Sequence, residues 1–249
     1  MRPCTLYSCQ VVNERLSRAT VAEHALKLAD AEGLDSVTIR RLAQELGVTP
    51  MALYWHFKNK DELLLGITDH VMAGVKATRD PADPWRNQVR AMVETLVAVM
   101  RAHPCLPALF QAVDKEQTTS FNRATNDALE LLTRAGFDLD ESHWIASYLM
   151  QGSIGLVAAQ PGCPTRMTPA EAAEWRRQKR LNLEKLPPDE YGMVVKFART
   201  LEDEPDIERY YAFGVDLLMA AVESTAARFS RRTPGARPRR SSPPESADR

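Results

Sequence analysis

Cysteine is scarce in this sequence, and its few positions form no metal-binding or disulfide pattern. The chain of 249 residues has 4 cysteines, with no CxxC pair and no cysteine and histidine spacing of a zinc site. Neither a disulfide framework nor a zinc finger is expected, and no metal is predicted. Reduced thiols, typical of the cytosol, are predicted for all four: Cys4, Cys9, Cys105 and Cys163.

Long apolar runs are also missing. No stretch approaches the roughly 18 to 20 apolar residues that cross a bilayer, and the opening residues, MRPCTLYSCQVV, lack the apolar region of a signal peptide. A cytoplasmic protein without membrane contact is expected. The formal net charge of -1 gives no overall attraction to nucleic acid, so any DNA affinity must come from a local basic face.

Catalytic motifs are absent as well. The 5 histidines are scattered, and no GxSxG, HExxH, GxxxxGK or GxGxxG pattern occurs. The sequence therefore predicts neither an enzyme nor a bound cofactor, and an all-helical enzyme remains a distant alternative.

Two short helical patterns flank a glycine in residues 38–60. An apolar stripe at helical spacing follows Thr38, which is a good N-cap residue. Gly47 then ends the first helix, and Thr49 with Pro50 supplies an N-cap and an N1 proline for the second. This pattern predicts a helix-turn-helix. The second helix is expected to dock on the first through two apolar residues one turn apart, Leu53 and Phe57.

Helical periodicity also dominates the rest of the chain, and strand alternation is hard to find. The predicted fold class is all-α, with an N-terminal three-helix helix-turn-helix domain and a larger helical domain. We expect an N-terminal arm (1–15), the helix-turn-helix domain (16–62), the larger domain (63–230) and a disordered basic tail (231–249). Helices are expected over about 17–32, 59–78, 85–103, 120–135, 142–159, 169–182 and 207–229. A proline-punctuated excursion is expected over 160–190.

The run LYWHFKNKDELL, together with the helix that precedes the motif, resembles the TetR family of bacterial transcription regulators. The resemblance implies a DNA-binding regulator whose second helix lies in the major groove, with residues 49–52 setting sequence preference. Packing against the first helix is the alternative role for Tyr54 and Trp55. The candidate DNA-contacting residues are Arg40, Arg41, Thr49, Pro50, Met51, Ala52, Tyr54, Trp55, His56, Lys58 and Lys60.

The larger domain resembles the tetracycline-repressor branch of the family more loosely, through the runs LMQGSIGLV and YAFGVDLLM. In that branch the two corresponding helices build a dimer interface. The resemblance implies a homodimer that reads a palindromic operator, and the small residues of the first run would permit close approach. The candidate interface residues are Gly152, Ser153, Gly155, Phe213, Leu217 and Ala220.

The same branch binds a metal chelate of tetracycline through polar pocket residues, and the corresponding positions differ here. Lys76 and Phe110 replace two histidines, and Val113 replaces a threonine ligand. A metal-tetracycline chelate is therefore not expected, whereas a mostly apolar small-molecule effector is. The candidate ligand-binding residues are Lys76, Met92, Leu96, Phe110, Val113, Ala128 and His143. Ordinary core packing is the alternative for each of them, as is a surface position for His143.

These features together predict a repressor that binds double-stranded operator DNA as a homodimer and is released by a small, largely apolar ligand. A transcriptional activator or a ligand-independent regulator of the same family is the alternative, since nothing in the sequence separates a repressor from an activator.

Overall fold

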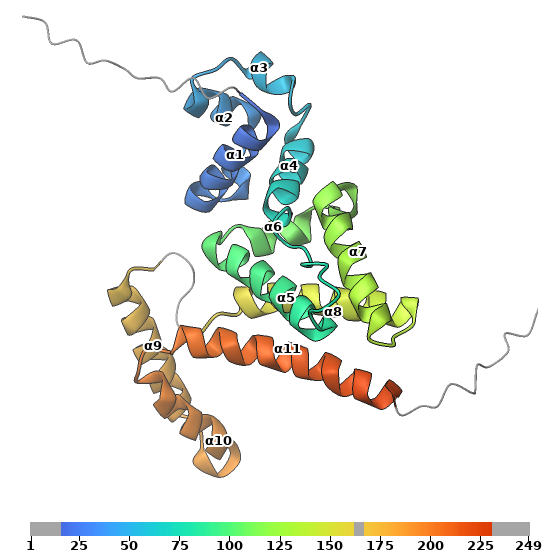
Figure 1. Ribbon diagram of the computed structural model, residues 1–249. Coiled ribbons are helices and arrows are strands. Elements are labelled where there is room, and N and C mark those ends of the chain that lie inside the picture. The colour runs from blue at the N-terminus through green and yellow to red at the C-terminus, as the bar shows by residue number, and fades with distance from the viewer. Residues whose placement is uncertain (1–15, 162–166, 231–249) are drawn as a thin grey trace, which may run out of the picture.

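The computed structural model describes residues 16–161 and 167–230, and over these ranges the chain forms eleven α-helices and no strand (Figure 1). The all-α fold class is confirmed. The helices are α1 (Arg18–Glu32), α2 (Ile39–Leu46), α3 (Pro50–Tyr54), α4 (Lys60–Met72), α5 (Trp85–Ala102), α6 (Leu106–Ala112), α7 (Thr119–Arg134), α8 (Leu139–Ala158), α9 (Pro169–Glu184), α10 (Pro188–Ala198) and α11 (Ile207–Ser230). Short 3-10 turns are η1 (Leu34–Ser36), η2 (Lys115–Gln117) and η3 (Arg199–Leu201).

Helices α1 to α3 form a three-helix unit at the top of Figure 1, and capping residues set their ends. Ser17 and Thr38 begin α1 and α2, because each side-chain oxygen accepts a hydrogen bond from a first-turn backbone N–H. Gly47 ends α2 in the left-handed conformation, with a φ of 65° that only glycine adopts without steric cost. Leu53 and Phe57 are both 0% exposed, so their expected docking in the core is confirmed.

Helix α4 joins this unit to the rest of the chain. The Asn59 side chain accepts a hydrogen bond from the N–H of Glu62. The Glu62 carboxylate accepts from the N–H of Lys58 and not from that of Asn59, so the start of the helix departs from a standard capping box. The helix ends at Met72, several residues before the expected end near 78.

The segment that follows α4 is bound to α7 instead of continuing the helix. The N–H of Ala77 donates to the carboxylate of Asp127 in α7 at 3.1 Å, so it is not available to an α4 helical turn. Arg79 has a φ of 59°, and its Nε donates to Oδ1 of Asp127 at 3.0 Å. Asp127 is 2% exposed, and these donors offset the cost of burying its charge. The hydrogen bond to Asp127 also raises the pKa of Arg79.

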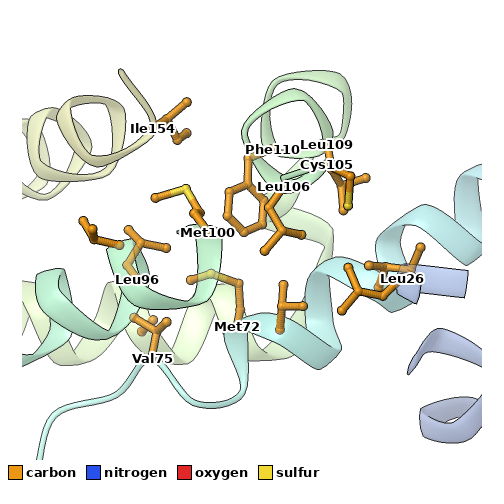
Figure 2. Packing of buried hydrophobic residues seen from close by; sticks show 14 of the residues in the cluster. Leu26, Met72, Val75, Leu96, Met100, Cys105, Leu106, Leu109, Phe110 and Ile154 are labelled. Atoms are coloured by element: carbon orange, nitrogen blue, oxygen red, sulfur yellow. The ribbon is translucent and has the colours of Figure 1, made fainter. Parts of the chain in front are cut away.

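The larger domain is built from α5, α7, α8 and α11, with α6 packed against α8 and α4. Figure 2 shows Phe110 of α6 in the apolar layer that Met100 of α5 also fills. Both side chains are 0% exposed. Helix α8 begins before the expected residue 142, because Asp138 and Glu141 form a capping box at its start.

Helices α9 and α10 form a hairpin that stands away from the other helices in Figure 1. Thr168 and Glu171 cap the start of α9, in agreement with the helix expected near 169–182. Helix α10 has no counterpart in the sequence prediction. It starts after Pro187, and the backbone at Tyr191 departs from helical geometry, so its periodicity is interrupted.

Within the described ranges, no helix is long and apolar enough to cross a membrane. The predicted N-terminal arm, the predicted basic tail, and Cys4, Cys9 and Cys163 lie outside these ranges. Cys105 lies within them and is buried. Burial, with a contribution from Asp30, raises the pKa of the Cys105 thiol well above its usual value, which is typical of an unreactive structural cysteine.

Candidate nucleic-acid interface and ligand cavity

Helix α3 presents large apolar and aromatic side chains to solvent. It begins after Thr49, whose hydroxyl accepts a hydrogen bond from the N–H of Ala52 at 3.3 Å. Met51, Tyr54 and Trp55 are 66%, 45% and 85% exposed. Trp55 therefore does not pack against the first helix, and the packing alternative for it is wrong. A cluster of large exposed side chains of this kind is typical of a contact surface.

Arg18 of α1 fixes the segment that follows α3. Its guanidinium donates to the carbonyl of His56 and lies 4.3 Å from the centroid of the Phe57 ring, which is a cation–π distance. Gly66 of α4 lies against the same ring, since a Cβ there would come within 2.3 Å of Phe57 Cε1. Two other helices therefore hold the end of α3. The sequence did not point to Arg18, because its partner lies 38 residues further along the chain.

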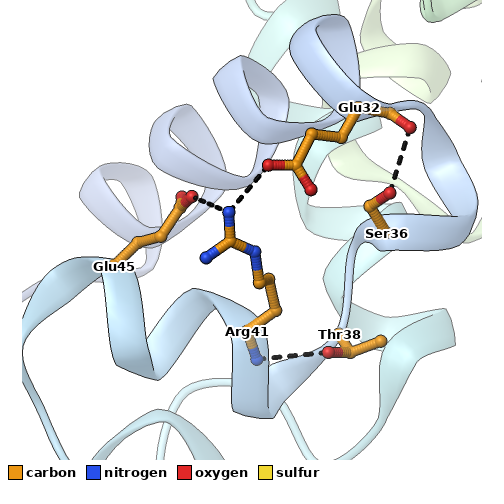
Figure 3. A network of polar contacts seen from close by, with 5 residues as sticks. All are labelled: Glu32, Ser36, Thr38, Arg41 and Glu45. Atoms are coloured by element: carbon orange, nitrogen blue, oxygen red, sulfur yellow. Dashed lines mark hydrogen bonds and ion pairs between the residues drawn. The ribbon is translucent and has the colours of Figure 1, made fainter.

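Arg41 differs from the other predicted DNA contacts, because its charge is used within the protein. Its guanidinium lies 2.7 Å from Glu32 and 3.0 Å from Glu45 (Figure 3). The hydrogen bond to Glu32, followed by the charges of both carboxylates, raises the pKa of Arg41. This pairing argues against the predicted DNA contact of Arg41. The remaining predicted contacts are exposed or half-buried: Arg40, Thr49, Pro50, Ala52, His56, Lys58 and Lys60.

A cavity of about 640 Å³ lies between α5, α7 and α8 and reaches the end of α4. Its floor consists of buried apolar side chains, among them Met72, Val89, Met92, Val93, Leu96 and Leu149. Its polar lining residues are more exposed and form the mouth: Lys115, Glu116, Asn122, Thr125, His143, Ser147 and Gln151.

Four of the predicted ligand-binding residues line this cavity, namely Met92, Leu96, Ala128 and His143. The other three predicted residues do not line this cavity. Lys76 is exposed, Phe110 is 0% exposed in the core, and Val113 is half-buried where α6 ends. For Phe110 the orientation of α6 is the reason, since the inner face of this helix packs against neighbouring helices (Figure 2).

Two carboxylates connect the helix-turn-helix unit and α4 to the larger domain. Asp30 of α1 accepts the N–H of Cys105 at 3.3 Å and lies 2.6 Å from Nδ1 of His103. Asp69 of α4 accepts the N–H of Ser120, in the first turn of α7, at 2.7 Å. Both carboxylates bind residues far away in the sequence, so no local pattern pointed to them.

Exposed apolar residues gather on α8 and α11, two helices that pack against each other. Phe213 and Leu217 of α11 are 67% and 61% exposed. Trp144 and Tyr148 of α8 are 58% and 74% exposed, and the sequence prediction had omitted both. These four residues are called the α8–α11 face below.

The small residues predicted for the dimer interface have different environments. Gly152 faces the chain's own α11, because a Cβ there would lie 2.5 Å from Cδ2 of Leu218. Ser153 is 0% exposed and donates to a carbonyl of its own helix at 2.7 Å. In the single chain both of these residues therefore make contacts within the chain itself. Gly155 and Ala220 are exposed, and no heavy atom of the described residues lies within 4 Å of a Cβ built on Gly155.

Residues 22–67 match the family described as bacterial regulatory proteins, tetR family. The Escherichia coli tetracycline repressor of class D is 27% identical over 213 residues, which cover 84% of this chain and 90% of that repressor. The helix-turn-helix domain of this chain is therefore that of a TetR-family protein. This TetR-family protein is a DNA-binding transcriptional regulator, and the relatives named as repressors are regulators rather than enzymes.

Solved structures extend the similarity across both domains. Streptomyces coelicolor ActR in complex with actinorhodin is 25% identical, with a TM-score of 0.70 over 85% of this chain and 98% of ActR. Mycobacterium smegmatis BioQ is 26% identical, with a TM-score of 0.57 over 84% of this chain and 99% of BioQ. BioQ with its double-stranded DNA operator gives a TM-score of 0.50 over 75% of this chain and 99% of that chain, at 26% identity.

Proposed function

We propose that this TetR-family regulator is a repressor that binds a palindromic operator as a homodimer and leaves it when a small, largely apolar molecule enters the cavity. The course of α4 carries this proposal. The helix begins at Lys60, shortly after the exposed Tyr54 and Trp55, and its last residue, Met72, lines the cavity. A ligand that displaces Met72 therefore shifts α4 as a whole. Because α3, the DNA-reading helix, directly precedes α4, it moves with it.

The exposed residues of α3 account for DNA recognition in this proposal. Met51 and Ala52 cannot form bidentate hydrogen bonds with bases, so specificity rests on thymine methyl groups, on Arg40 and on DNA shape. Lys58 and Lys60 provide positive charge for phosphates. The BioQ complex with its operator supports double-stranded DNA as the partner.

The cavity accounts for release. Its volume of about 640 Å³ lies within the range of about 300 to 1,000 Å³ that is typical of ligand pockets. The complex of ActR with actinorhodin supports a small organic molecule as effector. An effector shifts the equilibrium only by its difference in affinity for the two states, and a typical coupling of about 1 to 3 kcal/mol changes DNA affinity about five- to 150-fold.

The α8–α11 face accounts for the dimer. Its four large apolar side chains are each more than half exposed in the single chain, and a second copy would cover them by two-fold symmetry. Two recognition helices related by that symmetry read an inverted repeat.

Fluorescence anisotropy with duplexes from the region upstream of the protein's own gene tests the DNA-binding step. Binding is expected to require an inverted repeat and to weaken steeply as salt concentration rises. A reporter under that region should gain expression when the protein is removed. Binding that ignores salt, binding to no duplex at all, or a reporter that loses expression would each contradict a repressor.

A further inference from the structure

The polar residues of the cavity mouth are arranged in a stripe. His143, Ser147 and Gln151 lie at positions i, i+4 and i+8 of α8 and therefore share one side of that helix. Asn122 and Thr125, three residues apart on α7, also line the mouth. A molecule in the cavity thus meets hydrogen-bonding groups at the mouth, and those of α8 form a continuous stripe.

The floor of the cavity favours aromatic rings. Met72 and Met92 are buried in it, and Met150 and Phe121 are half-buried beside them. A thioether sulfur is polarizable and contacts the edge of an aromatic ring favourably, and an unbranched methionine side chain adapts to a flat surface. The remaining floor is aliphatic, so a charged or strongly polar group there would lose its hydration without compensation.

Among the described residues, Lys115 is the lysine or arginine that lines the mouth, and its charge is already engaged within the protein. The Lys115 ammonium group donates to the carbonyl of Phe110 at 2.5 Å, and Glu116 lines the mouth beside it. A carboxylate or phosphate headgroup would therefore compete with contacts that Lys115 already makes. A hydroxyl or carbonyl group, in contrast, matches the side chains of His143 and Ser147.

We propose that the effector is an uncharged molecule of several aromatic rings with hydroxyl or carbonyl groups along one edge, and that His143 and Ser147 select it by hydrogen bonding to that edge. This inference rests on the proposed effector role of the cavity. The rings lie against Met72 and Met92, and the polar edge faces the α8 stripe at the mouth.

Pyrene and 1-hydroxypyrene test the polar edge, because they share one ring skeleton and differ by a single hydroxyl group. Their fluorescence reports binding to the full-length protein directly. Ser147→Ala and His143→Leu should each weaken binding of 1-hydroxypyrene by about three- to tenfold, the effect of losing one hydrogen bond. Binding of pyrene should stay unchanged, since it makes no such bond.

Ser224→Ala is the matched control, because it removes an exposed hydroxyl from α11 and should alter neither affinity. Equal weakening of both probes by Ser147→Ala and His143→Leu would overturn the proposal. So would failure of the parent protein to bind either probe, or tighter binding of decanoate than of 1-hydroxypyrene. Circular dichroism confirms that each variant keeps its helical content.

Release of operator DNA is followed separately by anisotropy, so that the two proposals can fail independently. Binding of 1-hydroxypyrene with the expected variant pattern but without release would support the polar subsite and contradict the proposed release mechanism. Release that persists when Ser147→Ala and His143→Leu leave 1-hydroxypyrene affinity unchanged would support the mechanism and overturn the subsite.

Discussion

The guanidinium of Arg18 lies 4.3 Å from the centroid of the Phe57 ring, so the first turn of α1 is joined to the residue that anchors the end of the recognition segment. Arg18 also donates to the carbonyl of His56. The exposed Tyr54 and Trp55 thereby project from a segment that is held at its base. An arginine without any expected DNA contact thus contributes to the geometry of the DNA-facing surface.

Arg18→Ala removes both the ring contact and the hydrogen bond. We expect operator affinity to fall by about 1 to 2 kcal/mol, or about five- to thirtyfold, because the recognition segment loses its support. Anisotropy measures this change. Arg123→Ala, at an exposed arginine of α7, is the control and should bind like the parent protein. Identical affinities for the two variants would contradict the supporting role of Arg18.

Arg40 and Arg41 are neighbours with different predicted roles. Arg40→Ala should alter sequence preference, at a cost of about 1 to 3 kcal/mol for the preferred base pair. Arg41→Ala should leave the preference intact and lower stability only slightly, since exposed ion pairs contribute little. Binding to a set of single-base operator variants distinguishes the two. A preference that changes in Arg41→Ala would show that its pairing with Glu32 and Glu45 is broken on DNA.

Lys60 is proposed to contact phosphate and not a base. Lys60→Ala should therefore weaken binding to all duplexes to a similar extent and reduce the slope of log affinity against log salt by about 1. Salt titrations of operator and of scrambled DNA provide the measurement. A loss confined to the operator sequence would argue for a base contact.

Gly155 and Gly192 provide a matched pair for the dimer. Both are helical glycines at which no heavy atom of the described residues lies within 4 Å of an added Cβ, so arginine fits at either position within one chain. Gly155→Arg should give monomers that do not hold the operator, because Gly155 shares α8 with Trp144 and Tyr148. Gly192→Arg should remain dimeric. Size exclusion with light scattering decides, and a dimer in Gly155→Arg would place the interface elsewhere.

Phe110 belongs to the core and not to the cavity, so removing its ring should lower the stability of the protein. Phe110→Ala is expected to lower the free energy of unfolding by about 3 to 5 kcal/mol, since a fully buried ring leaves a cavity behind. Urea unfolding followed by circular dichroism measures the change. Val113→Ala, at the half-buried residue that follows the same helix, should cost much less. A stable Phe110→Ala variant would contradict this assignment to the core.

The helix-turn-helix could be predicted from the sequence because its determinants are local. Thr38, Gly47 and Thr49 set the helix ends through contacts with residues at most four positions away. The pairing of Arg41 with Glu32 depends instead on how α1 and α2 pack, so Arg41 looked like any other basic residue of the motif.

The larger domain was less accessible to such reasoning, because a helical stripe does not reveal which neighbour it faces. Phe110 and Met92 both stand on apolar stripes, yet one faces the core and the other the cavity. Gly152 was predicted to allow close helix approach at a dimer interface, and in the single chain the residue that approaches it is Leu218 of the same chain. Its partner helix was inferred from a resemblance, which could not distinguish a contact within a subunit from one between subunits.

Helix α8 carries the polar stripe and the exposed aromatic residues next to each other, and His143 and Ser147 are each followed at once by a residue of the α8–α11 face. In the proposed dimer, residues that choose the effector and residues that choose the partner subunit are therefore joined by single peptide bonds. Substitutions in one set of residues therefore also affect the other set. Duplicated copies of this gene that diverge toward new effectors would then also lose the ability to form dimers with the parent protein. A new effector specificity and the loss of mixed dimers would then arise together.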